Sequence, residues 1–179
     1  VVMIGAHVGC WEAGAGFFGN YGKRINIVMI DAEHQHIKDV LEENANEEKN
    51  YNIIPLNQNI IDAMLQMKVA LNKGEYICFN GDRYIGKENT ATADFLGSKA
   101  LFPRGLFQIA VKCRVPVVFY YSMREPDCTY RFIFEEPLIE QKITPENLLE
   151  QYSKSLEKIV AKYPRQWFNF YDFWNTQNN

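Results

Sequence analysis

The sequence predicts an α/β fold in which helices flank a mixed, mostly parallel β-sheet. Short apolar runs alternate with helical stretches along most of the chain, as they do in parallel sheets. Near the C-terminus two β-rich segments are separated only by a turn, which would add an antiparallel pair. Of the 179 residues, 47% are hydrophobic, which is enough for the core of a single domain spanning residues 1–179.

The first half of the chain is expected to alternate strands with helices. The strands are short apolar runs of the kind that is buried on both faces, over Val1–Ala6, Ile25–Ile30, Tyr51–Leu56 and Glu75–Asn80. The helices between them are expected over Trp11–Tyr21, Glu33–Lys49 and Ile60–Leu71, and Gly74 ends the last one. The apolar side of this last helix is expected to consist of Ile61, Met64, Leu65 and Val69.

After the fourth strand, the chain is expected to be irregular over Gly81–Leu101. Regular structure then resumes with a helix over Gly105–Cys113, strands over Val115–Met123 and Tyr130–Phe134, and a helix over Pro145–Lys162. Thr144 is the expected N-cap of the last helix, because its hydroxyl can accept from a free N–H of the first turn. The apolar positions of that helix are Leu148, Leu149, Tyr152, Leu156, Ile159 and Val160.

Composition and charge argue against several classes of function. The net charge of −3 gives no general attraction to nucleic acid. No apolar run reaches the roughly 20 residues that span a bilayer. The four cysteines, at positions 10, 78, 113 and 128, form no CxxC pair, which favours free thiols over disulfides or a cysteine zinc site. The sequence starts inside an apolar run, so we expect it to be truncated at the N-terminus, with any anchor outside it.

A histidine and a carboxylate follow the first expected strand. His7 comes directly after the strand and Glu12 comes five residues later. The two side chains can meet if His7 lies in the strand-to-helix turn, which Gly9 would ease, and Glu12 lies in the first helical turn. The carboxylate would then hold one imidazole nitrogen and leave the other as a general base. The spacing equally allows a histidine bonded to backbone and a solvated glutamate.

Asp82 and Arg83 follow the fourth expected strand. Ligand sites in parallel sheets gather at the carboxyl ends of strands, so His7 and Asp82 both lie where a site is expected. Asp82 is interpreted as an acid that supports the site or binds substrate, with a surface ion pair as the alternative. His34 and His36 suit exposed positions at a helix start better than a metal site, so no metal or cofactor is expected.

Ala6-His7-Val8-Gly9-Cys10-Trp11-Glu12 resembles the His-x4-Glu/Asp block of the lysophospholipid acyltransferase superfamily. It is most similar to the branch of lipid A lauroyl/myristoyl acyltransferases. Later segments resemble other parts of that branch in the same order: residues 80–83, 95–105, 110–118 and 163–168. These segments cover most of the chain, and the ordered set is much more specific than any one of them.

The resemblance implies a glycerolipid acyltransferase-like fold and an acyltransferase of lipid A and lipopolysaccharide biosynthesis. His7 would be the general base on a hydroxyl of a lipid A-type or other lysolipid or glycolipid acceptor, and Glu12 would orient it. The donor would be an acyl thioester of acyl carrier protein or coenzyme A, without an acyl-enzyme and without a cofactor. The resemblance also implies a membrane surface as partner. The enzyme would lie at the cytoplasmic face of the bacterial inner membrane, peripheral or anchored by a segment outside this sequence.

Six residues are expected to bind substrate: Gly9, Asp82, Arg83, Gly97, Arg104 and Gly105. Backbone N–H groups near Gly9 or Gly97 and the Arg104 guanidinium are alternative donors to the oxyanion of the transition state. The superfamily's Pro-Glu-Gly block stands here as Pro-Arg-Gly, and an arginine at position 104 suits an anionic headgroup.

Two other functional hypotheses stay open. A thioesterase-like hydrolase would use His7 and Glu12 with water, and it would release free fatty acid without an acceptor. A non-catalytic lipid-binding domain would keep its ligand affinity without His7. The sequence leaves the acceptor, the acyl chain length, the donor carrier and the oligomeric state undetermined.

Overall fold

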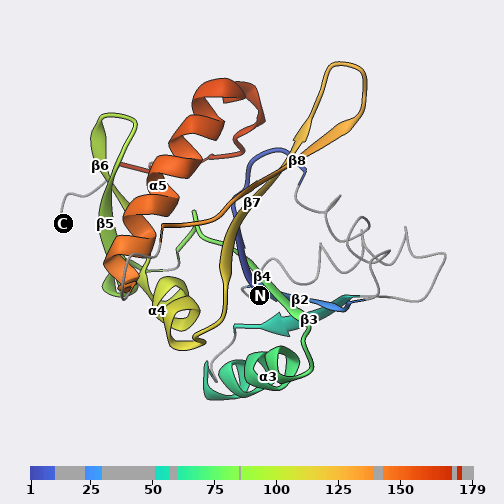
Figure 1. Cartoon of the computed structure of the whole chain (residues 1–179). Helices are drawn as coiled ribbons and strands as arrows, with labels where there is room; N and C mark the ends of the chain where they lie inside the picture. Colours follow the sequence, from blue (N-terminus) through green and yellow to red (C-terminus); the bar gives the residue numbers. More distant parts are fainter. Residues whose placement is uncertain are drawn as a thin grey trace.

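The computed structural model describes residues 1–10, 23–29, 51–56, 60–84, 86–138, 143–170 and 173–174 (Figure 1). The expected helices over Trp11–Tyr21 and Glu33–Lys49 lie outside these residues. Within the described part, a central sheet carries helices on one face and a separate β-hairpin packs beside the last helix.

The central sheet contains β1 (Val2–Gly5), β2 (Ile25–Met29), β3 (Tyr51–Pro55), β4 (Tyr76–Asn80), β7 (Val117–Arg124) and β8 (Tyr130–Glu135). Its strand order is β3-β2-β4-β1-β7-β8, with parallel pairing throughout except between β7 and β8. The predicted mixed, mostly parallel sheet is therefore confirmed. All four residues of the central strand β1 are buried, which explains its unbroken apolar sequence.

Three described helices, α3 (Ile60–Asn72), α4 (Arg104–Lys112) and α5 (Pro145–Lys162), pack on the same face of the sheet. Their buried side chains form one cluster with alternate residues of the strands, including Ile4 and Phe79. The six apolar positions predicted for α5 are all buried. The predicted N-cap is also confirmed, because the Thr144 hydroxyl accepts from the Asn147 N–H at 3.1 Å.

The apolar side predicted for α3 is wrong. All four of its residues are exposed, and Ile61 and Leu65 have 73% and 61% of their surface exposed. The helix instead buries smaller or more slender side chains, those of Ala63, Met67 and Ala70. Because two alanines let a helix lie close to the sheet, the packed face carries a weaker apolar signal than the exposed one.

The stretch 81–101 was expected to be irregular, and this is wrong for its second half. Here β5 (Thr90–Phe95) and β6 (Ser98–Pro103) form an antiparallel hairpin after the short 3-10 helix η1 (Lys87–Asn89). Leu96 and Gly97 form its turn with φ angles of 50° and 82°, which match the twist of a tight hairpin. The strands alternate small and polar residues with buried ones such as Phe95 and Phe102, so their apolar pattern is weak.

Candidate functional site

Parallel pairing of the central strands β1 and β4 brings two polar residues together at the carboxyl-terminal end of the sheet. Gly5 is in register with Asn80 at the carboxyl ends of the two strands. Each segment then continues for two residues past this pair, to His7 and to Asp82. The two side chains therefore leave neighbouring strands at the same height, although 75 residues separate them in sequence.

The His7 imidazole is held by the Asp82 carboxylate through two contacts. Its Nδ1 lies 2.8 Å from Asp82 Oδ1, and the backbone N–H of His7 donates to Asp82 Oδ2 at 2.9 Å. Asp82 is only 2% exposed, and the His7 side chain is 12% exposed. An ionised carboxylate only accepts, so Nδ1 carries the proton and Nε2 presents its lone pair.

The Nε2 atom of His7 is suited to remove a proton from a hydroxyl group. The amide nitrogen of Asn80 lies 3.5 Å from it, on the side where an unprotonated nitrogen accepts. Protonation at Nε2 would give an imidazolium whose charge the neighbouring Asp82 carboxylate stabilises. Burial of the pair strengthens this interaction relative to water.

From the sequence, Glu12 is expected to orient His7, and Asp82 is expected to support the site or to bind substrate. Glu12 lies outside the described residues, so its contact with His7 stays a prediction. The structure brings Asp82 into direct contact with the imidazole. The signal for this contact is the matching pattern at the two strand ends, in which one small residue, Ala6 or Gly81, separates each strand from the polar side chain.

A pocket beside the imidazole has mostly apolar walls. Its polar lining residues are His7, Asn80 and Arg83, and its other lining residues are Ile27, Val28, Met29, Leu56, Cys78, Phe79 and Leu106. Arg83 also donates from Nη2 to the carbonyl oxygen of Phe168 at 3.1 Å. The volume of the pocket is about 30 Å³, so its walls offer an apolar contact beside Nε2 for a small part of a substrate.

Tyr152 of α5 supports the backbone that leads from β1 to His7, a role that its sequence position does not indicate. It was predicted only as a core residue of the last helix, and it is fully buried. Its hydroxyl donates to the carbonyl oxygen of Gly5 at 2.7 Å, and the N–H of Gly81 donates to the same oxygen at 2.9 Å. A Cβ at Gly81 would lie 3.0 Å from side-chain atoms of Ile4 and of Tyr152, so any larger residue at this turn would require these neighbours to shift.

Gly9 sets the direction that the backbone takes after His7. Its φ is +69°, and a Cβ at this position would lie 2.1 Å from the carbonyl oxygen of Ser122 at the end of β7. The N–H of Gly9 donates to the carbonyl oxygen of Gln166 at 2.7 Å. This N–H therefore takes part in backbone pairing, and an oxyanion would have to displace Gln166 in order to use it.

The remaining predicted substrate-binding residues lie on other elements. Gly97 is in the turn between β5 and β6, and Arg104 and Gly105 begin α4. None of these three lines the pocket beside His7, whereas Leu106, the next residue of α4, does. Their roles in binding stay predictions.

The described residues contain no group of three or more His, Cys, Asp and Glu side chains arranged to hold a metal ion, and His34 and His36 lie outside them. None of the described helices has the length and apolar character needed to cross a membrane.

The chain matches one model of a known protein family. The family model described as bacterial lipid A biosynthesis acyltransferase matches residues 1–176. No curated protein gives a significant match to the chain.

Proposed function

Because the chain belongs to the bacterial lipid A biosynthesis acyltransferase family, we propose that it moves a fatty acyl group from a thioester to a hydroxyl of a lipid A-type or related glycolipid acceptor. The family match makes the chain an acyltransferase. The thioester carrier in the proposal is acyl carrier protein or coenzyme A. The observation that supports it best is the buried pairing of His7 with Asp82 beside a pocket with apolar walls.

In the proposed reaction, His7 Nε2 takes the proton of the acceptor hydroxyl as its oxygen attacks the thioester carbonyl. The resulting tetrahedral intermediate carries an oxyanion and collapses with cleavage of the C–S bond. The departing thiolate takes the proton from the imidazolium, so the products are an ester and a free thiol and the imidazole is neutral again. Asp82 keeps Nδ1 protonated and stabilises the transient positive charge.

The pocket matches an aliphatic group in the chemistry of its walls, and with a volume of about 30 Å³ it is too small to enclose a long acyl chain. Seven of its ten lining residues are apolar side chains or a buried cysteine, and they come from β2, the end of β3, β4 and α4. Arg83 adds a positive charge at the polar side of the pocket. This combination suits a substrate with a fatty chain and an anionic group near the reacting carbonyl.

The test is transfer from acyl-carrier-protein and coenzyme A thioesters to a panel of lipid A-type and lysolipid acceptors, with products identified by mass spectrometry. His7→Ala is expected to abolish the ester product and to leave the melting temperature close to that of the wild type. Free fatty acid that forms at the same rate without any acceptor would instead indicate a hydrolase. Full transfer activity in His7→Ala would refute the mechanism.

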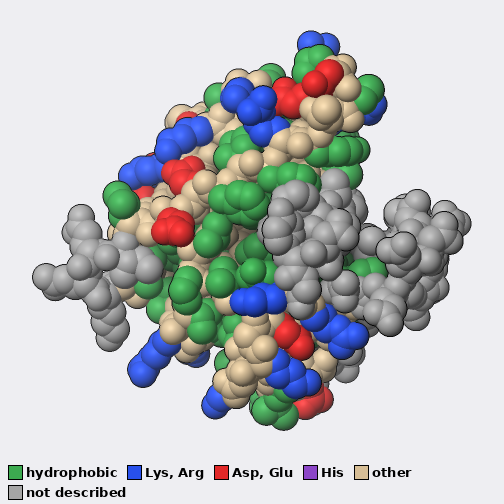
Figure 2. Space-filling model, turned by 45° about the vertical axis from the view of Figure 1, so that its right-hand side comes forward, with side chains coloured by type: hydrophobic (Ala, Val, Ile, Leu, Met, Phe, Trp, Pro, Cys, Tyr) green, Lys and Arg blue, Asp and Glu red, His purple; other side chains and the backbone are tan. Residues whose placement is uncertain are grey.

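We also propose that the protein works against an anionic membrane surface, at the cytoplasmic face of the inner membrane. Support comes from the exposed apolar residues of α3, namely Ile61, Met64, Leu65 and Val69, which share one side of the helix with Lys68. Figure 2 shows Lys and Arg side chains, with Asp and Glu side chains among them, beside hydrophobic ones in the lower part of the molecule, where α3 lies. Apolar side chains flanked by lysines are typical of helices that lie on anionic lipid.

Co-sedimentation with vesicles that contain phosphatidylglycerol tests this membrane contact. The double variant Ile61→Ser with Leu65→Ser is expected to lower the bound fraction severalfold, because it removes two exposed apolar side chains. The control is Leu138→Ser, since Leu138 is 77% exposed but lies outside this helix. Equal binding by the double variant and the wild type would contradict this proposal and would leave the proposed reaction untouched.

A further inference from the structure

The segment that begins with the last residue of η2 (Pro164–Gln166) runs antiparallel to the segment that carries His7. We call residues Gln166–Phe168 the C-terminal strap. Its Phe168 N–H donates to the carbonyl oxygen of His7 at 2.9 Å, and its Gln166 carbonyl oxygen accepts from Gly9 at 2.7 Å. Val8 and Trp167 form an isolated antiparallel bridge between these two bonds. The strap therefore holds the carbonyl group of His7, whereas Asp82 holds its N–H.

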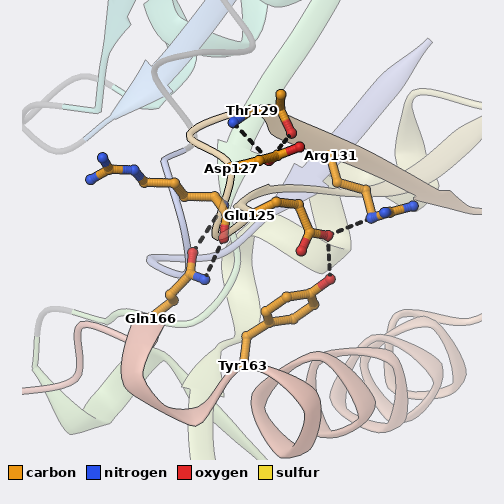
Figure 3. A network of polar contacts seen from close by, with 7 residues as sticks. Glu125, Asp127, Thr129, Arg131, Tyr163 and Gln166 are labelled. Atoms are coloured by element: carbon orange, nitrogen blue, oxygen red, sulfur yellow. Dashed lines mark hydrogen bonds and ion pairs between the residues drawn. The ribbon is translucent and has the colours of Figure 1, made fainter.

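The side chain of Gln166 ties the strap to the end of β7. Its Oε1 accepts from the backbone N–H of Arg124 at 3.0 Å, and its Nε2 donates to the Arg124 carbonyl oxygen at 2.8 Å (Figure 3). One carboxamide thus takes the place that a neighbouring strand would occupy at this residue. Arg124 is the last residue of β7, two positions beyond the Ser122 carbonyl that accepts from Cys10.

The strand end to which Gln166 binds is itself fixed by polar contacts. Glu125 accepts from Tyr163 at 3.0 Å and from Arg131 of β8, so α5, β7 and β8 meet at this residue (Figure 3). These two hydrogen bonds lower the pKa of Glu125, which keeps the carboxylate ionised. Gln166 therefore joins the His7 segment to a strand end that polar contacts also tie to β8 and to the residue that follows α5.

We propose that Gln166 is a positioning residue for the reaction, which acts on His7 through the C-terminal strap and touches neither substrate nor the reacting atoms. Asp82 fixes the N–H and Nδ1 of His7, and the strap fixes the His7 carbonyl group. With both ends of the residue held, Nε2 has one position relative to the pocket. Shifts of about 1 Å in a catalytic group lower rates by up to roughly a hundredfold.

Contacts other than the Gln166 carboxamide also hold the strap, including the Gly9 N–H bond to the Gln166 carbonyl oxygen, since Gly9 is itself bridged to Ser122 of β7. The Trp167 ring packs against Phe95 and Phe173 at centroid distances of 5.4 and 5.3 Å, and Arg83 bonds to the Phe168 carbonyl group. Both contacts lie on residues after Gln166. Removing the Gln166 carboxamide is therefore expected to leave the strap in place and to loosen its alignment with His7.

Gln151 offers a matched control. Its carboxamide makes the same pair of bonds to one backbone residue: Oε1 accepts from Leu138 N–H at 2.6 Å, and Nε2 donates to the Leu138 carbonyl oxygen at 3.0 Å. Neither Gln151 nor Gln166 lines the pocket beside His7. Gln151 Nε2 also donates to Asn147 Oδ1 at 2.7 Å, so Gln151→Met removes the same pair of backbone bonds as Gln166→Met and one side-chain bond more. Only Gln166 lies on a segment that bonds to the His7 backbone.

The experiment compares the two variants in acyl transfer and in spectra of ¹⁵N-labelled histidine. Q166M is expected to lower kcat about ten- to a hundredfold and to leave KM for the thioester within about twofold. Its His7 ring signals, identified by their loss in a His7→Asn variant, are expected to shift or broaden. Q151M is expected to keep kcat within about twofold and to leave those signals unchanged. Thermal melts of both variants measure the loss of stability that they share.

An unchanged kcat in Q166M, or equal falls in Q166M and Q151M, would overturn the proposal. Should Q166M fail to fold, Gln166→Glu and Gln151→Glu carry the same comparison, because glutamate keeps the oxygen that accepts from the backbone N–H. The kinetic arm rests on the proposed function, whereas the histidine spectra do not. Absence of acyl transfer in the wild type would count against the proposed function, and the spectra would still decide the role of Gln166.

Discussion

Replacement of Asp82 by asparagine should switch the protonated nitrogen of His7. In the wild type, one carboxylate oxygen accepts from the His7 backbone N–H and the other from the imidazole Nδ1–H. An asparagine must keep its oxygen toward the backbone N–H, so its NH₂ group faces Nδ1 and requires an acceptor there. The imidazole proton then moves to Nε2, the atom that would accept the substrate proton.

The size of the effect follows from this loss of the reactive tautomer. The imidazole would be a poor base in its stable form, and no carboxylate would stabilise the imidazolium. In enzymes with a comparable His–Asp pair, such a change lowers kcat by about 10³- to 10⁴-fold, which corresponds to roughly 4–5.5 kcal/mol in the barrier. The hydrogen bond to the His7 backbone is kept, so we expect the melting temperature to change little.

Two measurements check this prediction, kcat for acyl transfer and the ¹⁵N shifts of the His7 ring, which report the tautomer. The control is Asp94→Asn, which removes the same charge from an exposed residue paired with Lys99 at 2.8 Å. The control should keep both kcat and the His7 tautomer. A D82N enzyme with kcat within about threefold of wild type, or with Nδ1 still protonated, would refute the reasoning.

Other predictions address the segment after His7, the glutamate and the cysteines. Gly9→Ala would place a Cβ 2.1 Å from the Ser122 carbonyl oxygen at a residue whose φ is +69°. Urea denaturation should therefore show that the free energy of unfolding falls by about 2–4 kcal/mol. A fall below about 0.5 kcal/mol would contradict the described turn. Glu12→Ala is expected to lower the transfer rate by about a hundredfold if Glu12 also orients the base, and an unchanged rate would leave Asp82 as the orienting carboxylate. Burial raises the pKa of the Cys78 thiol to about 12, so iodoacetamide at pH 8 should label exposed Cys128 and spare Cys78 in the folded protein, and equal labelling would contradict its burial. Because the unfolded chain loses the Cys78 proton near its ordinary pKa of 9.0, the free energy of unfolding should fall as the pH rises from about 9 toward 12.

The strands and the last helix could be predicted because their patterns match their burial. Strands covered on both faces need apolar residues at every position, as in β1, and α5 buries every apolar position that its periodicity indicated. Helix α3 shows the limit of the same logic. Its packed side is small because it lies close to the sheet, and its large apolar side chains face outward. Composition alone does not tell a packed side from an exposed apolar one.

The candidate site could be predicted in part. His7 and Asp82 were both expected at carboxyl ends of strands, and both are found there. Their contact depends on which strands are neighbours, and the order β4-β1 is set by tertiary packing between segments far apart in sequence. The contribution of Gln166 was equally hidden, because its partner Arg124 is defined only once the chain has folded.

The register between Gly5 and Asn80 has a consequence for changes in chain length. A single residue, Ala6 on one strand and Gly81 on the other, separates each member of this pair from its polar side chain. An insertion or deletion of one residue at either position would turn His7 or Asp82 away from its partner. Changes of length elsewhere between the two strands leave the register intact, so natural variation in length should concentrate there.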